Sequence, residues 1–461
     1  MPRLTINDIA CEFKDGDSVL KAALDNGIDI PHFCWHPKLS VSGNCRLCSV
    51  EMEGCKDLVL ACNTKAEEGM SIITESERIN KARGDVLELF LVNHPLDCPV
   101  CDKSGECLLQ DYYFKYSGRA SRFDLPKVKK GKVIDIGKNL MLDDERCVLC
   151  TRCVRFLDEI AKDDSLSVAG RGDCSFLTPP PLRSVDSPYS LNTVDVCPVG
   201  ALTSKDFRFK KRVWLLKSAE TICPGCSNGC EILADHSGGV IYRFRPKVPS
   251  EFICDTGRLS YKDYQGENRL KEIICHPLRS EGPSVATLSD AGFFDLLRMT
   301  KDIVVVISPF ISCEEITKIM ELLNGARFLV SAPDDDPDFA DNIIRKGDRS
   351  PNYGFIKGLG VKRLEDELSA GALIVIDRLF GDDILKVAGF GVEKIIQFAF
   401  DRRFIVPKAD VVFPMATFLE EEGSFVNFAG ASQRFSKVLE PAVGVKKVSE
   451  WIEILLVSPS L

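Results

Sequence analysis

The chain has 461 residues, a net charge of −9 and 20 cysteines, and 45% of its residues are hydrophobic. This length suits about three domains or more, and the hydrophobic content excludes wholesale disorder. The negative charge gives no sign of a nucleic-acid-binding protein, and no apolar run approaches the roughly 18 residues of a membrane span.

The cysteines are unevenly distributed, and all but Cys275 and Cys313 lie within the first 254 residues. Disulfides would be the default in a secreted protein. However, the N-terminal residues lack the apolar core of a secretory signal, and the cysteines lie in short, metal-type spacings. We therefore expect a reduced, cytosolic, metal-loaded first part, followed by an ordinary α/β part.

Residues 1–78 read as a small first domain. The pattern predicts strands at 4–6 and 10–13 and a helix at 18–26, for which Ser18 is a suitable N-cap. A first set of four possible metal ligands follows, and it consists of Cys34, Cys45, Cys48 and Cys62.

The loop 43–48 of this set looks like the ligand loop of plant-type ferredoxins, although the first gap of ten residues exceeds their four. A glycine there lets backbone amides approach the sulfurs. We predict a [2Fe–2S] cluster. Zinc, free buried cysteines, and Cys55 in place of Cys62 as a ligand are the alternatives.

Residues 79–118 begin with an amphipathic run at 82–92. Three cysteines follow, and the next one is forty residues away, so a cluster here would lack one ligand. His94 starts this segment and is the nearest nitrogen donor, which favours a [4Fe–4S] cluster, with zinc as the rival. This second set consists of His94, Cys98, Cys101 and Cys107.

Residues 123–138 are basic and read as a connector. A solvated face is the preferred interpretation, and a docking patch is the alternative. The lysines concerned are Lys127, Lys129, Lys130 and Lys132.

Residues 138–212 contain three cysteines separated by two residues each, and then a distant Cys-Pro pair, which is the pattern of a bacterial ferredoxin cluster. The pattern occurs once, so we predict one [4Fe–4S] cluster here, with structural zinc as the rival. A short helix is expected at 154–160, and Cys174 is a spare candidate. The third set consists of Cys147, Cys150, Cys153 and Cys197.

Residues 219–275 contain another complete group of four cysteines around a predicted strand at 239–244. The gaps of two, three and twenty-three residues predict a further [4Fe–4S] cluster. This fourth set consists of Cys223, Cys226, Cys230 and Cys254.

Residues 285–461 alternate strand and helix patterns, which favours a parallel sheet covered by helices. No phosphate-binding glycine motif and no catalytic Ser/His/Asp arrangement is evident, so we expect no NADH site and no catalytic residue. His32, His36, His236 and His276 show no ligand spacing and are expected to be structural. The clearest elements are strands at 303–307, 328–330 and 373–376 and a helix at 314–323.

Four clusters in about 220 residues indicate an electron-transfer chain that passes single electrons, since an isolated cluster would suffice for a structural or regulatory role. The ligands are fifteen cysteines and His94. We expect one [2Fe–2S] and three [4Fe–4S] clusters.

The order and spacing of the four sets resemble those of the large iron–sulfur subunit of complex I, the bacterial NADH:quinone oxidoreductase. The resemblance is strong over residues 1 to about 272. It continues weakly at 409–414 and 422–427, which look like segments of the family's molybdopterin-oxidoreductase-like domain.

The resemblance implies a multidomain α+β and α/β chain. The domains would be a β-grasp [2Fe–2S] ferredoxin-like domain, a His-Cys cluster segment, a ferredoxin-like [4Fe–4S] domain, a small [4Fe–4S] module and a truncated α/β molybdopterin-oxidoreductase-like domain. That last domain looks short for one that carries molybdenum, so we expect no molybdenum cofactor.

The resemblance also implies a role in a respiratory enzyme. Electrons from NADH and FMN on a partner subunit would enter at the first set, pass to the third and then the second, and leave to a neighbouring subunit. The fourth set would lie off this path. The complex would be peripheral on the cytoplasmic face of the cell membrane, without direct membrane insertion of this chain.

Two other functions compete with this one. A soluble NAD-linked hydrogenase or formate dehydrogenase uses similar N-terminal modules, but the former needs further cysteines after about residue 260 and the latter needs molybdenum. A zinc-binding scaffold is the third interpretation, and it predicts a colourless protein.

Overall fold

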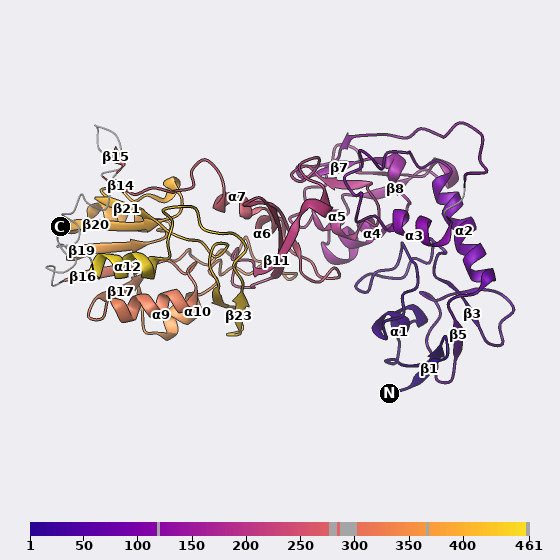
Figure 1. The fold of residues 1–461 in the computed structure, drawn as a ribbon, viewed down its shortest axis with the longest axis horizontal. Coiled ribbons are helices and arrows are strands. Elements are labelled where there is room, and N and C mark those ends of the chain that lie inside the picture. The colour runs from indigo at the N-terminus through magenta and orange to yellow at the C-terminus, as the bar shows by residue number, and fades with distance from the viewer. Residues whose placement is uncertain (118–119, 276–283, 286–301, 366–367, 458–461) are drawn as a thin grey trace. The chain divides into compact units, whose positions relative to one another are not determined.

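The computed structural model describes residues 1–117, 120–275, 284–285, 302–365 and 368–457. The chain divides into two compact units (Figure 1). The N-terminal unit comprises Met1–Leu215 and Pro249–Phe252, and the C-terminal unit comprises Leu216–Val248 and Ile253–Leu461. His276 and the start of the predicted last domain lie outside the described residues.

The N-terminal unit begins with a mixed sheet of five strands in the order β2-β1-β5-β3-β4. Helix α1 (Val19–Asp25) packs on this sheet, and the Ser18 hydroxyl accepts a hydrogen bond from the Lys21 amide at 3.2 Å, as an N-cap should. The predicted strands and helix of this segment are thus present. The strands are β1 (Arg3–Ile6), β2 (Ile9–Glu12), β3 (Ser49–Met52), β4 (Val59–Leu60) and β5 (Ser71–Ile73).

Two helices follow this sheet, α2 (Glu77–Leu91) and α3 (Leu108–Tyr116). The predicted amphipathic run at 82–92 lies almost entirely within α2. The Phe33 ring contacts Phe90 of α2 at 5.3 Å and Tyr112 of α3 at 5.5 Å between centroids. Because Phe33 precedes Cys34, this aromatic contact anchors the first set against both helices.

The rest of this unit is built from short elements around the third set. The helix predicted at 154–160 is α4 (Arg152–Arg155), which continues directly into a π-helical segment, Phe156–Ile160. The remaining elements are β6 (Ile134–Asp135), β7 (Leu140–Leu142), β8 (Ser167–Ala169), β9 (Phe176–Thr178), α5 (Asn192–Val196) and β10 (Leu202–Ser204), with 3-10 turns at Asp144–Arg146, Gly172–Cys174 and Val213–Leu215.

The basic connector is fastened to the unit by its lysines. The Lys127 ammonium donates to the carbonyls of Leu91 and Val92, both at 2.8 Å, and Lys130 donates to the Ser175 carbonyl at 2.6 Å. Lys132 forms an ion pair with Glu145 at 3.0 Å. The expectation of a solvated face is therefore wrong for Lys127 and Lys130, which are part-buried and bind backbone carbonyls, whereas Lys129 and Lys132 are exposed as expected.

The C-terminal unit starts with an antiparallel sheet, β11 (Lys217–Ile222), β12 (Glu231–Ser237) and β13 (Val240–Pro246), followed by α6 (Asp255–Leu259) and α7 (Tyr261–Tyr264). A hairpin of β22 (Gly423–Val426) and β23 (Ser432–Phe435) belongs to the same unit.

The main sheet of this unit has eight strands in the order β15-β14-β21-β20-β19-β16-β17-β18. The six strands from β21 to β18 are parallel, as predicted, whereas β14 and β15 pair antiparallel at one edge. The strands are β14 (Ile274–Cys275), β15 (Ser284–Val285), β16 (Ile303–Ile307), β17 (Arg327–Val330), β18 (Lys362–Arg363), β19 (Ser369–Ile376), β20 (Gly391–Ala399) and β21 (Val411–Pro414).

Both faces of this sheet are buried. Neighbouring residues of a strand point to opposite faces, so Val305 of β16 packs with α9 and α12, whereas Val304 packs with α11. This explains the continuous apolar runs of its strands. The helices are α9 (Cys313–Leu322), α10 (Tyr353–Gly358), α11 (Asp383–Gly389) and α12 (Val448–Val457), with a 3-10 turn at Arg402–Phe404.

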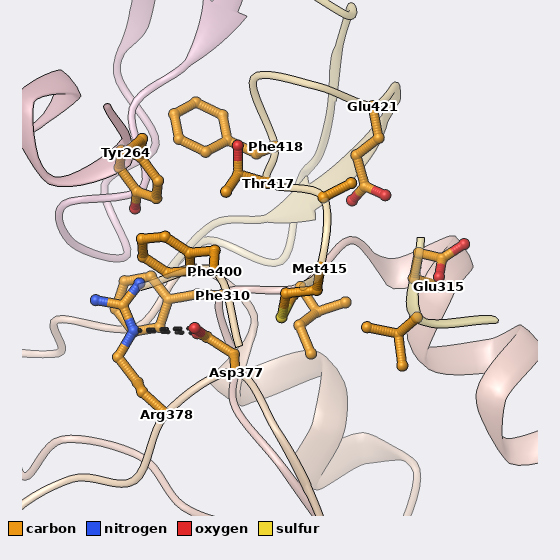
Figure 2. A pocket seen from close by; sticks show the side chains of 13 residues that line it. Tyr264, Phe310, Glu315, Asp377, Arg378, Phe400, Met415, Thr417, Phe418 and Glu421 are labelled. Carbon is orange, nitrogen blue, oxygen red and sulfur yellow. Dashed lines mark hydrogen bonds and ion pairs between the residues drawn. The ribbon is translucent and has the colours of Figure 1, made fainter. Parts of the chain in front are cut away.

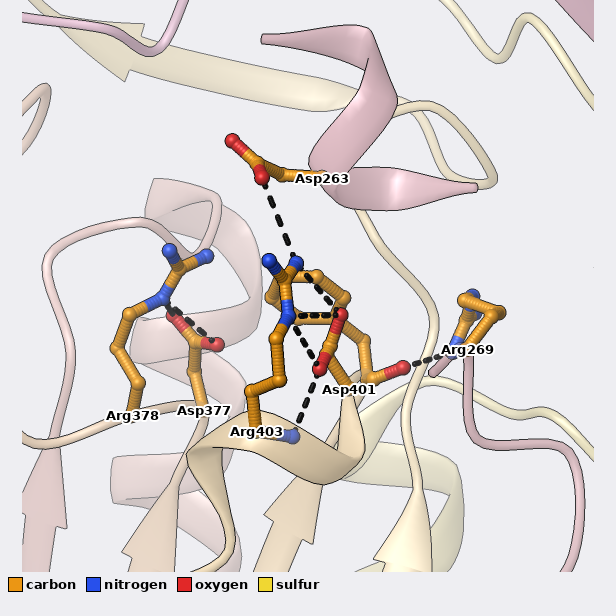
Figure 3. A network of polar contacts seen from close by, with 7 residues as sticks. Asp263, Arg269, Asp377, Arg378, Asp401 and Arg403 are labelled. Atoms are coloured by element: carbon orange, nitrogen blue, oxygen red, sulfur yellow. Dashed lines mark hydrogen bonds and ion pairs between the residues drawn. The ribbon is translucent and has the colours of Figure 1, made fainter. Parts of the chain in front are cut away.

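A polar network ties the segment around α7 to this sheet (Figure 3). Arg403 pairs with Asp401 at 2.8 Å and reaches Asp263 at 3.4 Å. Arg269 donates to the Phe400 carbonyl at 3.0 Å. The residues that follow the fourth set are therefore held to the carboxyl end of β20.

Among the described residues, no helix combines the length and apolar character needed to cross a membrane.

Candidate metal centres

The first set is a closed group of thiols. Cys34 lies within hydrogen-bonding distance of Cys45 and Cys62, and Cys48 contacts Cys62. All four are at most 3% exposed, whereas Cys55 is exposed. The contact with Cys45 lowers the pKa of the Cys34 thiol strongly, and the contact with Cys34 raises the pKa of Cys45 and Cys62. The contact with Cys62 likewise lowers the pKa of Cys48, so the group favours thiolate at Cys34 and Cys48 before any metal binds.

Backbone geometry explains how this loop converges. Gly43 and Arg46 both adopt left-handed φ angles, +64° and +60°, on either side of Cys45. The amide of Phe33 donates to the Cys45 sulfur at 3.3 Å. Amide donors of this kind stabilise negative charge on a cluster and tune its potential.

The third set lines one cavity of about 290 Å³, part of which is open to solvent. Its other walls are mostly apolar, including Leu177 and Leu202. Burial raises the pKa of Cys150 to about 11 and raises the pKa of Cys147 and Cys153 as well. Four thiols around an apolar hollow fit a metal cluster, because bound iron supplies the positive charge that thiolates need there.

Left-handed residues again shape the turn. Leu149 and Thr151 have φ angles of +49° and +58°. They flank Cys150, so the chain reverses on both sides of the middle cysteine of the motif. These are costly conformations for residues with side chains, and their position between ligands indicates that the turn serves the site.

The second set is only partly gathered. Cys101 is buried, and burial raises the pKa of its thiol and raises the pKa of Cys107 to about 11. The charge of Cys98 adds to the shift at Cys101, and the charge of Cys101 adds to the shift at Cys107. His94 is half-buried, and burial, followed by the charge of Arg146, lowers its pKa to about 4. Its imidazole is therefore neutral at pH 7, which is the form that binds metals. Its role as a ligand stays a prediction.

The fourth set lies in the C-terminal unit. Burial, followed by the charges of the other three cysteines of the set, raises the pKa of the Cys223 thiol. Amides reach these sulfurs: Gly257 donates to Cys254 at 3.4 Å, and the Asn228 side chain donates to Cys230 at 3.1 Å. A side chain at Gly257 would place its Cβ 2.7 Å from the Cys223 sulfur. Sequence reasoning missed both residues; the available signal was their position, two residues before Cys230 and three after Cys254.

The described residues contain no three His, Cys, Asp or Glu side chains gathered closely enough to hold one metal ion. A single zinc ion requires three or four protein ligands on one atom.

The first and third sets are neighbours within the N-terminal unit. The Asn44 side chain donates to the Leu149 carbonyl at 2.9 Å, and the Arg155 guanidinium donates to the carbonyls of Cys34 and Cys150. The contacts of Asn44 with Leu149 and of Arg155 with Cys34 join residues more than a hundred positions apart. The ligand loops of the two sets are thus held directly against each other.

The third and second sets also touch. The Leu108 amide donates to the Pro198 carbonyl at 3.0 Å, next to Cys107 and Cys197 respectively. Gly200 faces Cys101 so closely that a Cβ atom there would lie 2.3 Å from the Cys101 sulfur. The third set therefore contacts both the first and the second sets.

A hollow of about 380 Å³, partly open to solvent, lies at the carboxyl ends of the parallel strands (Figure 2). Such ends are the usual ligand positions of α/β sheets. Here Arg378 pairs with Asp377 at 3.1 Å and lies over the rings of Phe310, Phe400 and Phe404, at 4.9, 4.8 and 4.3 Å. The chain's own side chains thus occupy much of this crevice.

Comparison with protein families gives four matches in chain order. They are a 2Fe-2S iron-sulfur cluster binding domain at 2–77, the NADH-ubiquinone oxidoreductase-G iron-sulfur binding region at 83–122, the ferredoxin-like domain of NADH-quinone oxidoreductase subunit 3 at 137–203, and a molybdopterin oxidoreductase domain at 397–455.

Several curated proteins are similar. The G subunit of NADH-quinone oxidoreductase from Streptomyces coelicolor is 40% identical over 273 residues, which cover 58% of this chain and 32% of that protein. Its counterpart from Mycobacterium bovis is 41% identical over 61% of this chain and 35% of its own length. The 75 kDa subunit of NADH-ubiquinone oxidoreductase from Reclinomonas americana is 34% identical over 77% and 53%.

A solved chain of an NAD+-reducing [NiFe]-hydrogenase is 34% identical, with a TM-score of 0.42, over 46% of this chain and 91% of that chain. The matches to the curated proteins span only about a third to a half of those proteins' lengths. The shared domain order and the identity of about 40% nevertheless agree with the ligand spacings. In domain order, and over 58–77% of its length, the chain is therefore similar to the large iron–sulfur subunit of NADH-quinone oxidoreductase, the G subunit of complex I.

Proposed function

We propose that this chain is the electron-transfer iron–sulfur subunit of a respiratory NADH:quinone oxidoreductase. The observation that carries the proposal is the contiguity of three ligand sets in one unit. The third set lines a cavity, and its loops contact those of the first and second sets. Electron transfer requires closely spaced centres, and this arrangement provides them.

The clusters we propose are one [2Fe–2S] at the first set and one [4Fe–4S] at each of the other three, without a molybdenum cofactor. When bound, such clusters accept and pass on one electron at a time. The chain's residues fix the positions of the ligands, bury most of the thiols and donate amide hydrogen bonds to the sulfurs.

The domains we propose are a β-grasp ferredoxin-like domain at 1–78, a His-Cys₃ cluster domain at 79–118, a ferredoxin-like domain at 138–212, a [4Fe–4S] module at 219–275 and a reduced molybdopterin-oxidoreductase-like domain at 285–461. The mixed five-stranded sheet with α1 supports the first of these. The parallel sheet covered on both faces supports the last.

The partners we propose are the NADH- and FMN-binding subunit and other peripheral-arm subunits of complex I. The names of the relatives support this assembly. The complex would lie at the cytoplasmic face of the cell membrane, and this chain would not insert into the membrane.

Iron, acid-labile sulfide, zinc and molybdenum analysis of the anaerobically purified chain tests the proposal. One two-iron and three four-iron clusters predict about 14 iron atoms per chain, without stoichiometric zinc or molybdenum. Low-temperature EPR during a redox titration should show each cluster. A chain that contains zinc in place of iron would contradict the proposal.

His94→Cys tests the least secure ligand. Thiolate is negative where imidazole is neutral, so the variant should keep about four iron atoms at the second set but lower that cluster's reduction potential. In Rieske centres, histidine ligands in place of cysteine raise the potential in the same way. A redox titration followed by EPR measures this shift. His94→Ala should lose the cluster, and a midpoint unchanged in His94→Cys would remove His94 from the ligands.

A further inference from the structure

Arg152 is a buried cation at the start of α4, between two ligands of the third set. Its residue is 7% exposed. One guanidinium nitrogen donates to the Trp35 carbonyl at 2.5 Å and another to the Val196 carbonyl at 3.4 Å. Trp35 follows Cys34 of the first set, and Val196 precedes Cys197 of the third. A single side chain thus holds the backbone next to a ligand in each set.

Arg152 has no carboxylate partner within ion-pair distance among the described residues, and its Nε atom has no hydrogen-bond acceptor there. A buried guanidinium paired only with neutral carbonyls costs several kcal/mol of desolvation. A nearby anion would offset this cost. The cysteine thiols that act on its charge belong to both sets: Cys150 in the third, and Cys45 and Cys34 in the first.

Arg146 differs from Arg152 in how its charge is balanced. It is also buried, at 6% exposure, and it also lies beside a third-set ligand. However, it pairs with Asp97 at 2.9 Å and with Asp143 at 3.3 Å, so carboxylates neutralise its charge. The cation between the third and second sets is thus balanced by the protein itself, whereas Arg152 is not.

Arg155, one helical turn further on, holds the two loops at a fixed separation. It donates to the carbonyls of Cys34 and Cys150, and its Nε donates to the Thr151 hydroxyl at 3.2 Å. The position of Arg152 relative to both sets is therefore fixed by contacts that do not involve its own side chain.

We propose that Arg152 is the shared counter-cation of the first and third sets, a positioning residue that raises the reduction potentials of both clusters together. The inference rests on the proposed function, since it assumes clusters at both sets. Reduction adds negative charge to a cluster, and a cation in a region of low dielectric stabilises the reduced state of each. The electron step between the two clusters would then stay balanced, because one charge shifts both potentials in the same direction.

Arg152→Gln in the full chain tests this inference by a redox titration followed by low-temperature EPR. We expect about a tenfold fall in the reduction equilibrium constant of the first- and third-set clusters, which corresponds to about 59 mV for one electron. The fourth-set cluster should keep its potential. Arg171→Gln removes the same charge from an exposed position of the same unit and should change neither potential.

Arg152→Lys separates charge from hydrogen bonding, because lysine keeps the charge but cannot reproduce the fork of donors. In this variant, the reduction equilibrium constants of both clusters should stay within about twofold of those of the wild type. Unchanged potentials in the glutamine variant, or equal shifts in both variants, would overturn the inference. If the glutamine variant loses iron, the potentials of the lysine variant alone test the inference. Lowered potentials of the first- and third-set clusters in that variant would contradict a charge effect. A wild-type chain without iron would instead refute the proposed function.

Discussion

Gly200→Ala is expected to remove about four iron atoms from each chain while the fold around it remains. The added Cβ atom would lie 2.3 Å from the Cys101 sulfur, far inside van der Waals contact, and 3.3 Å from the Lys103 Cβ. The φ angle of Gly200 is one that alanine readily adopts, so the constraint is steric alone. A free thiol can rotate away at small cost, whereas a thiol bound to iron cannot. The loss should therefore fall on the second-set cluster.

Iron and acid-labile sulfide content together with EPR of the second-set cluster measure this effect. The iron content should fall from about 14 to about 10 atoms per chain, given one two-iron and three four-iron clusters. Gly354→Ala is a suitable control, because no atom lies within 4 Å of the position that its Cβ would take and its φ angle is also ordinary. Full iron content and an unchanged EPR signal in Gly200→Ala would show that Cys101 does not hold a cluster.

Local patterns predicted much of this structure because they depend on neighbours in sequence. Ser18 caps α1, β16 runs from Ile303 to Ile307 as expected, and the two-residue gaps between the third-set cysteines agree with the turns found at Leu149 and Thr151. Each of these features follows from a few consecutive residues, whose capping, hydrophobic period or ligand spacing can be read directly.

The residues that connect the sets were not predictable in this way. Arg152 contacts Trp35, which is 117 positions away, and Gly200 meets Cys101. Neither residue carries a motif, and an arginine or a glycine beside a cysteine is ordinary in isolation. Their importance follows from loops that only the tertiary fold brings together.

For the connector lysines, a prediction was made from the sequence and was wrong in part. Their composition suggested a solvated face, yet Lys127 and Lys130 donate to backbone carbonyls of other segments. A run of charged residues shows what the side chains can bind, and helix ends such as that of α2 offer carbonyl acceptors.

The antiparallel edge of the main sheet, formed by β14 and β15, was missed because each of these strands has only two residues.

Glu421→Gln is expected to stabilise the C-terminal unit increasingly as the pH rises. Glu421 lines the hollow at the carboxyl ends of the sheet strands, and it is 5% exposed (Figure 2). Burial, followed by the charge of Glu315, raises its pKa to about 8. Glu315 is held in place by the Ser449 amide and hydroxyl, which donate to it at 3.0 and 2.9 Å. The hollow therefore keeps Glu421 protonated at neutral pH.

The sign of the pH dependence follows from this raised pKa. Between the ordinary glutamate pKa of about 4.3 and about 8, the folded chain holds a proton that the unfolded chain has lost. The free energy of unfolding of the wild type therefore falls by about 1.4 kcal/mol per pH unit in this window. Glutamine carries no such proton, so the advantage of the variant should be absent near pH 4 and reach a few kcal/mol near pH 8.

Calorimetric unfolding of both chains between pH 5 and pH 8 measures this difference. Glu422→Gln is the matched control, because the neighbouring Glu422 side chain is 68% exposed and its loss should leave the unfolding temperature nearly unchanged at every pH. A constant difference between Glu421→Gln and the wild type would mean that Glu421 is ionised throughout this range. The hollow would then have to hold two carboxylates, Glu315 and Glu421, with Lys447 as the cation that offsets them.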